Sequence, residues 1–259
     1  MRVLLPERPR PLIFAHRGCS SLAPENTMAA FRKARDAGAP GLELDIHATK
    51  DGGLVVAHDD TFERTAPQCG SKQLEELTVR EIKHFDVGSF FDPAFAAERP
   101  PLLEEVFEEF CPDLYIDIEL KSHRTKNDPL PQLLAERLKA LGPKAAESVT
   151  VSSFNPVCLR SFKTAWKRLR NTPIACAVIY CASAEVPFPL RHGAGRFIAG
   201  CDYLKPRYTQ VNVWRRALCA LEGRPLVPWT VDDGALARRL FHLGCAGIIT
   251  NRPQDIVER

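Results

Sequence analysis

Short apolar runs alternate with segments of helical spacing along most of the chain. The apolar runs are rich in Val, Ile and Leu, which is typical of buried strands. The segments between them repeat their apolar residues every three or four positions, which predicts amphipathic helices. Strands are expected at residues 12–15, 41–46, 114–120, 148–153, 174–180, 201–205, 226–231 and 246–250. Helices are expected at residues 28–37, 103–110, 130–141, 157–169, 211–221 and 233–243.

Eight strand–helix units in a chain of 259 residues indicate an α/β fold of the closed (β/α)8 type, the TIM barrel, formed by residues 1–259 as one domain. An open doubly wound sheet is the alternative. No GxGxxG or GxxxxGK[ST] motif opens a helix, so the usual nucleotide-binding reason for such a sheet is absent. In two units the helix is poorly predicted. Residues 187–195 are rich in proline and glycine, which predicts a loop or a short helix. The last helix, beginning at Pro253, is expected to be short.

One connection is too long for a regular barrel. Between the second strand and the second barrel helix, residues 59–100 form an insertion, with a helix of its own that begins at the capping box of Thr78 and Glu81. Aromatic residues are dense in this insertion, at Phe85, Phe90 and Phe91 and again at position 95. They are expected either to form a small satellite core or to wall one side of a substrate cleft.

Composition and charge exclude several classes of function. The 35 Lys and Arg residues against 32 Asp and Glu residues give a formal charge of +3, which is too small to indicate a nucleic-acid partner. The N-terminal apolar stretch is broken by Pro6, Pro9 and Pro11, so neither a signal peptide nor a transmembrane segment is expected. Nine cysteines without a CxxC pair favour free thiols in the cytoplasm and disfavour zinc. The composition leaves the oligomeric state open.

Candidate chemistry is densest in GLELDIHATKDGGLVVAHDD, residues 41–60. Glu43 and Asp45 are two positions apart in an apolar strand, so both carboxylates must point to the same face. Buried neighbouring carboxylates imply a bound cation or raised pKa values. The turn at residues 51–53 predicts a hairpin that returns His58 toward the carboxylates. A hairpin with a merely solvated charged face is the alternative.

Further polar residues lie toward the carboxyl ends of other predicted strands. In a barrel these ends meet at one mouth, where active sites are built. We expect Asp117, which shares a face with Glu119 but lies deeper, to be a buried partner of Lys121 or Arg17. The residues that should converge at the mouth are His16, Arg17, Glu43, Asp45, His58, Glu119, Lys121, Lys205 and Trp229.

The motifs in residues 41–60, together with others along the chain, resemble those of the glycerophosphodiester phosphodiesterase family. The resemblance covers almost the whole chain, and the combination of motifs at these separations is far more specific than any one of them. Two positions depart from the family pattern: Leu102 stands where Thr is common, and Asn251 stands where Asp is common. The matching motifs are HRG at 16–18, PENT at 24–27, ExD at 43–45, TKDG at 49–52, VVAHD at 55–59, DVG at 86–88, PLLEEV at 101–106, IELK at 118–121, SSF at 152–154, WTV at 229–231 and GIITNRP at 247–253.

The resemblance implies a metal-dependent hydrolase that cleaves glycerophosphodiesters, its small-molecule substrates, to sn-glycerol 3-phosphate and an alcohol. It implies the metal ligands Glu43, Asp45 and Glu119, and carboxylates are ligands suited to one Mg²⁺ or Ca²⁺ ion. It also implies an acid and base pair and two phosphate contacts. The pair is His16 and His58, and the contacts are Arg17 and Lys121.

We expect in-line attack at phosphorus, with His16 favoured as the base and His58 as the acid. The attacking hydroxyl belongs either to water or to glycerol through a cyclic phosphate, and the sequence leaves both routes open. Trp229 is expected either in the core or at the barrel mouth, where it would pack on the glycerol carbons.

Two other functions are kept as alternatives. One is a lysophospholipase D or sphingomyelinase D-like activity on a lipid, which would need an apolar entrance to the site. The other is a non-catalytic barrel that serves as a scaffold. A scaffold is disfavoured because the two histidines and three carboxylates of the implied site are all present.

Overall fold

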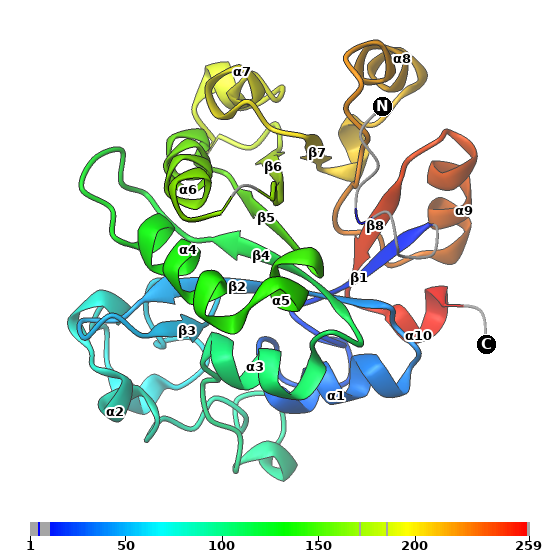
Figure 1. Ribbon diagram of the computed structural model, residues 1–259. Coiled ribbons are helices and arrows are strands. Elements are labelled where there is room, and N and C mark those ends of the chain that lie inside the picture. Colours follow the sequence, from blue (N-terminus) through cyan, green and yellow to red (C-terminus); the bar gives the residue numbers. More distant parts are fainter. Residues whose placement is uncertain (1–4, 6–10, 171, 185, 258–259) are drawn as a thin grey trace.

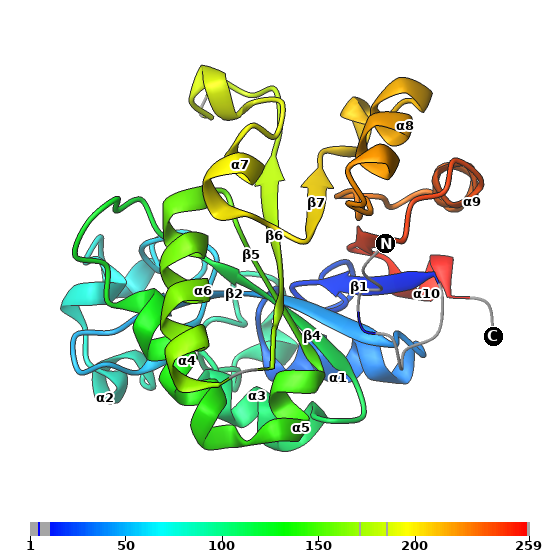
Figure 2. The ribbon, with the colours of Figure 1, turned by 45° about the horizontal axis from the view of Figure 1, so that its top comes forward.

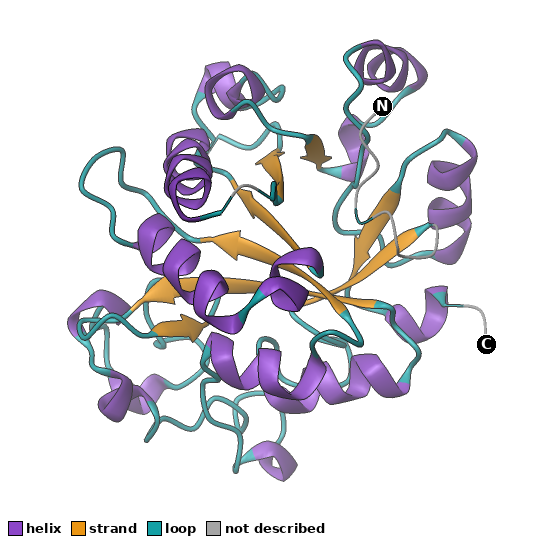
Figure 3. Ribbon diagram, in the orientation of Figure 1, coloured by secondary structure: helices purple, strands orange, loops and turns teal. Residues whose placement is uncertain are grey.

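The computed structural model describes residues 5, 11–170, 172–184 and 186–257. Seven parallel strands follow the order β7-β6-β5-β4-β2-β1-β8 around the molecule, and β3 pairs antiparallel with β2 (Figures 1 and 3). The parallel strands are β1 (Leu12–His16), β2 (Gly41–Ala48), β4 (Tyr115–Leu120), β5 (Val149–Ser153), β6 (Ala175–Tyr180), β7 (Tyr203–Pro206) and β8 (Gly247–Thr250). The strands predicted in these seven places are confirmed, as is the hairpin that β3 (Leu54–Val56) forms with β2.

The eighth position of the barrel is filled by residues 225–231, which lie between β7 and β8. The Val227 and Trp229 amides donate to β7 carbonyls at 2.9 and 3.1 Å, and the Ile249 amide of β8 donates to the Pro228 carbonyl at 3.0 Å. The prediction of a regular strand here is wrong, because Pro225 and Pro228 have no N–H to donate and interrupt the ladder. The predicted closure of the barrel is nevertheless confirmed by these bonds.

Helices cover the outside of the sheet (Figure 2). Their starts follow from local capping: the Thr27 side chain accepts from the Ala30 amide, and Asn155 accepts from two amides of the helix that Pro156 opens. The helices are α1 (Met28–Asp36), α3 (Leu103–Phe110), α4 (Leu130–Leu141), α5 (Pro143–Glu147), α6 (Pro156–Leu169), α7 (Gly195–Ala199), α8 (Val213–Leu221), α9 (Gly234–His242) and α10 (Pro253–Ile256). The six predicted helices are confirmed to within a few residues. The weak segment before β7 holds the short α7 and a 3-10 turn at Phe188–Leu190.

The insertion lies beside β3 and includes α2 (Val79–Ile82), drawn in cyan in Figure 1. The capping box predicted for α2 is present, since Glu81 accepts from the Thr78 amide at 2.8 Å and donates its own amide to Thr78 Oγ1. The Phe62 and Phe85 rings pack edge to face at 5.5 Å in a small apolar cluster with Ile82. Phe85 therefore belongs to a satellite core, one of the two predicted arrangements.

The lower half of the barrel interior is apolar and closely packed. The Tyr115 ring stacks edge to face on Phe14 at 4.8 Å, and its hydroxyl donates to the Ile13 carbonyl at 2.9 Å. Gly41 is required beside it, because a Cβ there would lie 1.9 Å from the Tyr115 ring. This packing closes the barrel from below and leaves the polar side chains to gather above it.

None of the nine cysteines, which all lie in the described part of the chain, forms a disulfide. No helix in the described part of the chain is both long and apolar enough to cross a membrane. The cytoplasmic location stays a prediction.

Candidate active site

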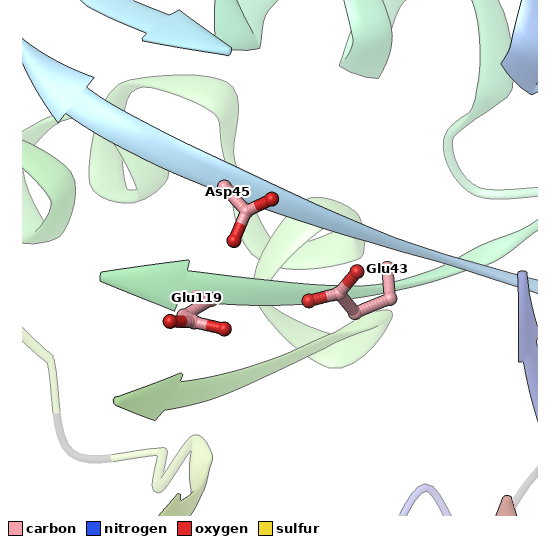
Figure 4. A group of neighbouring side chains, drawn as sticks. All are labelled: Glu43, Asp45 and Glu119. Atoms are coloured by element: carbon pink, nitrogen blue, oxygen red, sulfur yellow. The ribbon is translucent and has the colours of Figure 1, made fainter. Parts of the chain in front are cut away.

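Three carboxylates meet above the apolar layer of the barrel. Glu43 and Asp45 project from the same face of β2, and Glu119 lies directly across from Asp45 in the pairing of β2 with β4 (Figure 4). One oxygen from each carboxylate lies within 4.8 Å of the other two, and all three side chains are buried. This arrangement could hold a metal ion.

The three acids do not share one electrostatic environment. Burial and then the neighbouring Asp45 charge raise the pKa of Glu43 well above its usual value. Burial also opposes ionisation of Asp45, but Lys121 and Arg17 outweigh it and hold the pKa of Asp45 well below its usual range. The Lys205 charge opposes this rise in the pKa of Glu43 but does not outweigh it, so a divalent cation would stabilise the ionised carboxylate of Glu43.

Two cations flank the acids. Lys121 Nζ lies 3.0 Å from Glu119 and 3.6 Å from Asp45, while Arg17 Nε lies 3.3 Å from Asp45. Arg17 adopts a left-handed backbone conformation with a φ of 55°, and its amide donates to Glu43 at 3.1 Å. Gly18 follows with a φ of 84°, and a Cβ there would lie 2.6 Å from Ala30. This close approach explains the glycine of the HRG motif.

His16 is oriented by an amide. Its Nδ1 lies 2.6 Å from Asn251 Oδ1. The amide is fixed in that direction because Asn251 Nδ2 donates to Asp232 at 2.8 Å, so His16 Nδ1–H must donate and Nε2 is left for the site. Burial and then Arg17 lower the pKa of His16 to about 4.

His58 is oriented by a carboxylate. Asp59 Oδ1 accepts from His58 Nδ1 at 2.6 Å, and Asp59 Oδ2 accepts from Arg64 Nε at 2.6 Å. Arg64 also donates to both oxygens of Glu25, which accepts from Arg17 at 2.9 Å. A continuous chain of charged hydrogen bonds therefore joins the imidazole of His58 to the guanidinium of Arg17.

A buried ion pair lies beneath the carboxylates. Lys205 Nζ donates to Asp117 at 2.7 Å and to Ser152 Oγ at 2.8 Å, and both charged side chains are at most 1% exposed. The prediction that Asp117 is a buried ion-pair partner is confirmed. The predicted cation, Lys121 or Arg17, is wrong, because Asp117 pairs with Lys205. Lys121 is drawn instead to Glu119 and Asp45, because the side chain at the end of β4 points over the mouth, whereas Lys205 reaches inward from β7.

One cavity of about 670 Å³ opens beside these groups. Trp229 lines it, stacked edge to face on Phe154 at 5.6 Å, with its indole N–H donating to the Lys205 carbonyl. Asp45 lies behind the cavity wall and is 1% exposed. The other predicted site residues all line the cavity: His16, Arg17, Glu43, His58, Glu119 and Lys121.

Comparison with known sequences identifies the family of the chain. A model of the glycerophosphoryl diester phosphodiesterase family matches residues 16–255. The chain belongs to this family. A glycerophosphodiester phosphodiesterase from Caldanaerobacter subterraneus subsp. tengcongensis is 36% identical over 249 residues, which cover 96% of this chain and 97% of that protein. One from Bacillus subtilis is 30% identical and covers 94% of this chain and 84% of that protein.

Solved structures of the family agree with the fold. A phosphodiesterase from Oleispira antarctica, in complex with the product sn-glycerol-3-phosphate, matches with a TM-score of 0.82 at 27% identity, over 95% of both chains. The (β/α)8 fold predicted from the strand pattern is confirmed, and this member of the glycerophosphoryl diester phosphodiesterase family is an enzyme, a phosphoric diester hydrolase.

Several residues that support the phosphodiesterase site were not singled out in the sequence. Asp59 and Glu25 lie inside the VVAHD and PENT motifs, so their neighbourhood carried a signal. Arg64 and Asp232 carried no such signal, because an isolated charged residue in a predicted loop cannot be distinguished from an ordinary solvent-exposed one. Asn251 was visible only as a departure from the family pattern, and its role as the amide that orients His16 depends on folding.

Proposed function

We propose that this phosphodiesterase hydrolyses glycerophosphodiesters to sn-glycerol 3-phosphate and an alcohol, using one divalent cation and two histidines. The observation that carries the proposal is the convergence of three carboxylates, two imidazoles and two cations at one cavity. The Oleispira antarctica protein holds sn-glycerol-3-phosphate as its product, which supports the same product here. The cytoplasm is the proposed compartment, from the thiol content alone.

The cation would be held by Glu43, Asp45 and Glu119. Three carboxylates are hard oxygen ligands that suit Mg²⁺ or Ca²⁺, and their convergence with the raised pKa of buried Glu43 fits a positive ion at this position. When bound, such an ion neutralises phosphate oxygens and polarises the attacking hydroxyl, an effect of several kcal/mol.

The partners of the two histidines support different roles for them. The carboxylate of Asp59 is a charged partner that holds Nδ1 of His58 and leaves Nε2 to donate a proton to the departing alkoxide. Asn251 is a neutral partner that leaves His16 with a free Nε2 lone pair, which suits a base. His16 would take the proton from the attacking hydroxyl, and it can deprotonate either water or the 2-hydroxyl of glycerol in the same way.

The remaining site residues would hold the substrate. Arg17 and Lys121 line the cavity on either side of Asp45 and are placed to contact the equatorial phosphate oxygens. Trp229 offers a ring face in the cavity wall on which the glycerol carbons can pack.

Metal removal tests the proposal directly. EDTA-treated protein should release sn-glycerol 3-phosphate from glycerophosphocholine at least about a hundredfold more slowly, because the stabilisation that a cation supplies is lost. Added Mg²⁺ or Ca²⁺ should restore the rate. Glu119→Gln should not be restored by either metal, whereas Glu108→Gln, on the exposed face of α3, should behave as the unsubstituted protein.

An undiminished rate in EDTA would contradict the metal dependence. If no metal supports release from glycerophosphocholine or glycerophosphoethanolamine, the proposed substrate class is wrong. Failure on lipid substrates as well would favour the scaffold alternative.

A second candidate substrate is a lysophospholipid, because half of the cavity is apolar. Several of the lining residues are apolar side chains from β6 and from the segments around α6 and α7. A cavity of about 670 Å³ also exceeds what glycerol 3-phosphate needs. The apolar wall consists of Phe154, Val157, Ile179, Val186, Leu190 and Ile198.

Comparison of two substrates separates these candidates. If the apolar wall binds an acyl chain, Leu190→Asn should lower kcat/KM for lysophosphatidylcholine by about tenfold and leave glycerophosphocholine unaffected. The measurement is the release of sn-glycerol 3-phosphate from glycerophosphocholine and of lysophosphatidic acid from lysophosphatidylcholine. Equal effects on both substrates would contradict an acyl-binding wall.

A further inference from the structure

The amphipathic helix α8 carries its apolar face outward. Trp214, Leu218 and Leu221 recur at positions i, i+4 and i+7 and so form one stripe along the helix. Their exposed fractions are 85%, 51% and 87%, and Val213 beside them is 65% exposed. Only Cys219 of this helix is buried. The usual reason for an amphipathic helix, burial of its apolar stripe in the core, does not apply here.

Arginines on the inner face hold the helix in this orientation. Arg215 Nη1 donates to the Tyr180 hydroxyl at 3.3 Å and to the His192 carbonyl at 3.1 Å. Arg216 Nε donates to the Gly244 carbonyl at 3.0 Å. A rotation that buried Trp214 would break these three bonds, so the outward stripe is a fixed feature of the fold.

A second group of exposed apolar side chains lies on the neighbouring segment around α7. Arg196 of α7 donates to both carboxylate oxygens of Glu222, at the end of α8, at 2.9 and 3.1 Å, and Figures 1 and 2 show the two helices flanking β7. Phe197 is 70% exposed and Phe188 is 74% exposed. We call the set Phe188, Phe197, Val213, Trp214, Leu218 and Leu221 the α7–α8 patch.

The α7–α8 patch reaches the mouth of the candidate active site. Leu190, two residues after Phe188, lines the cavity, and so does Ile198, the neighbour of Phe197. One side of this segment therefore faces the substrate cavity while the other side faces outward.

The segment that carries the patch has a net positive charge. Residues 188–224 contain six arginines against two acids, Asp202 and Glu222, apart from Lys205, which is buried against Asp117. Two of the arginines lie over patch aromatics: Arg196 is 4.3 Å from the Phe197 ring centre and Arg191 is 5.9 Å from that of Phe188. Exposed Trp, Phe and Leu side chains on a segment of net positive charge are the composition of a surface that rests in the headgroup layer of a bilayer.

We propose that the α7–α8 patch docks on anionic lipid bilayers, with Trp214, Leu218 and Leu221 entering the headgroup layer and Arg191, beside Phe188, contacting a lipid phosphate. A second copy of the chain fits less well, because two-fold pairing would set the same arginine-rich face against itself. Docking would place the cavity mouth at the lipid surface. It adds a location to the proposed function and does not depend on which diester is cleaved.

Vesicle binding tests the docking without turnover. The full chain in EDTA should co-sediment with vesicles containing about one third phosphatidylserine, at least about tenfold more tightly than with pure phosphatidylcholine. Raising NaCl from about 0.05 M to about 0.5 M should release it, because salt screens exposed charges. Trp214 is the exposed member of three tryptophans, so its fluorescence should shift to the blue on binding.

A triple variant identifies the surface. W214Q/L218Q/L221Q should lose binding by about tenfold or more and lose the blue shift, since the inserted apolar area is gone. Its kcat on glycerophosphocholine should be unchanged, which also shows that it is folded. Phe91→Gln, a 42%-exposed aromatic in the insertion, is the matched control and should bind as the unsubstituted protein.

Three outcomes would overturn the proposal. They are absence of binding to anionic vesicles at low salt, binding by the triple variant as tight as that of the unsubstituted protein, and a dimer in solution that the triple variant converts to a monomer. The last outcome would assign the patch to self-association. None of them depends on the rate of diester hydrolysis, so failure of docking and failure of the proposed reaction are distinguishable.

Discussion

Replacing His16 by alanine is expected to lower kcat for glycerophosphocholine by about 10² to 10⁴. Asn251 Oδ1 holds His16 Nδ1 at 2.6 Å and leaves Nε2 to accept the proton of the attacking hydroxyl. The loss should fall on kcat more than on KM, because Arg17 and Lys121 remain to bind the phosphate. Initial rates of sn-glycerol 3-phosphate release over a range of substrate concentrations measure both.

A substrate with a better leaving group distinguishes the base from the acid. His58→Ala removes the proposed acid, so its deficit should shrink by about tenfold or more on a nitrophenyl ester of glycerol phosphate, whose leaving group needs no proton. The deficit of His16→Ala should remain. His84→Ala, exposed in the insertion, is the control and should keep full activity. The opposite pattern would exchange the two roles, and an active His16→Ala would remove His16 from the chemistry.

The site could be found in the sequence because its ligands follow strand periodicity. Glu43 and Asp45 are two positions apart, and this spacing alone places both carboxylates on one face of β2. The turn at residues 51–53 then limits how far His58 can lie from them. Glu119 needed more than local pattern, because only the pairing of β4 with β2 sets it opposite Asp45.

Other features depend on partners that are distant in the chain. Lys205 and Asp117 are 88 positions apart, and nothing near either residue tells which cation the acid will meet. The orientation of α8 could not be predicted from the sequence either, because its pattern of apolar residues predicts a helix with a buried stripe. The bonds that turn the stripe outward come from Arg215 and Arg216, and their acceptors lie on other segments.

The largest expected effect on stability comes from the buried ion pair. Lys205→Met should lower the free energy of unfolding by about 3–5 kcal/mol, because it leaves the Asp117 carboxylate buried without its cation. Thr150, Ser152 and Tyr203 still donate to that carboxylate at 3.1 to 3.3 Å, but hydroxyls carry no charge to balance it. Urea denaturation in EDTA measures the change without a contribution from bound metal.

Matched variants separate the charge from the packing. Asp117→Asn in the Lys205→Met background should recover much of the loss, because no uncompensated charge then remains in the barrel. Arg32→Met removes an exposed bidentate pair with Glu109 and should cost less than about 1 kcal/mol. If the double variant were as unstable as Lys205→Met alone, lost packing would explain the effect. If Lys205→Met were as stable as Arg32→Met, the Lys205–Asp117 ion pair beneath the three carboxylates would not stabilise the fold.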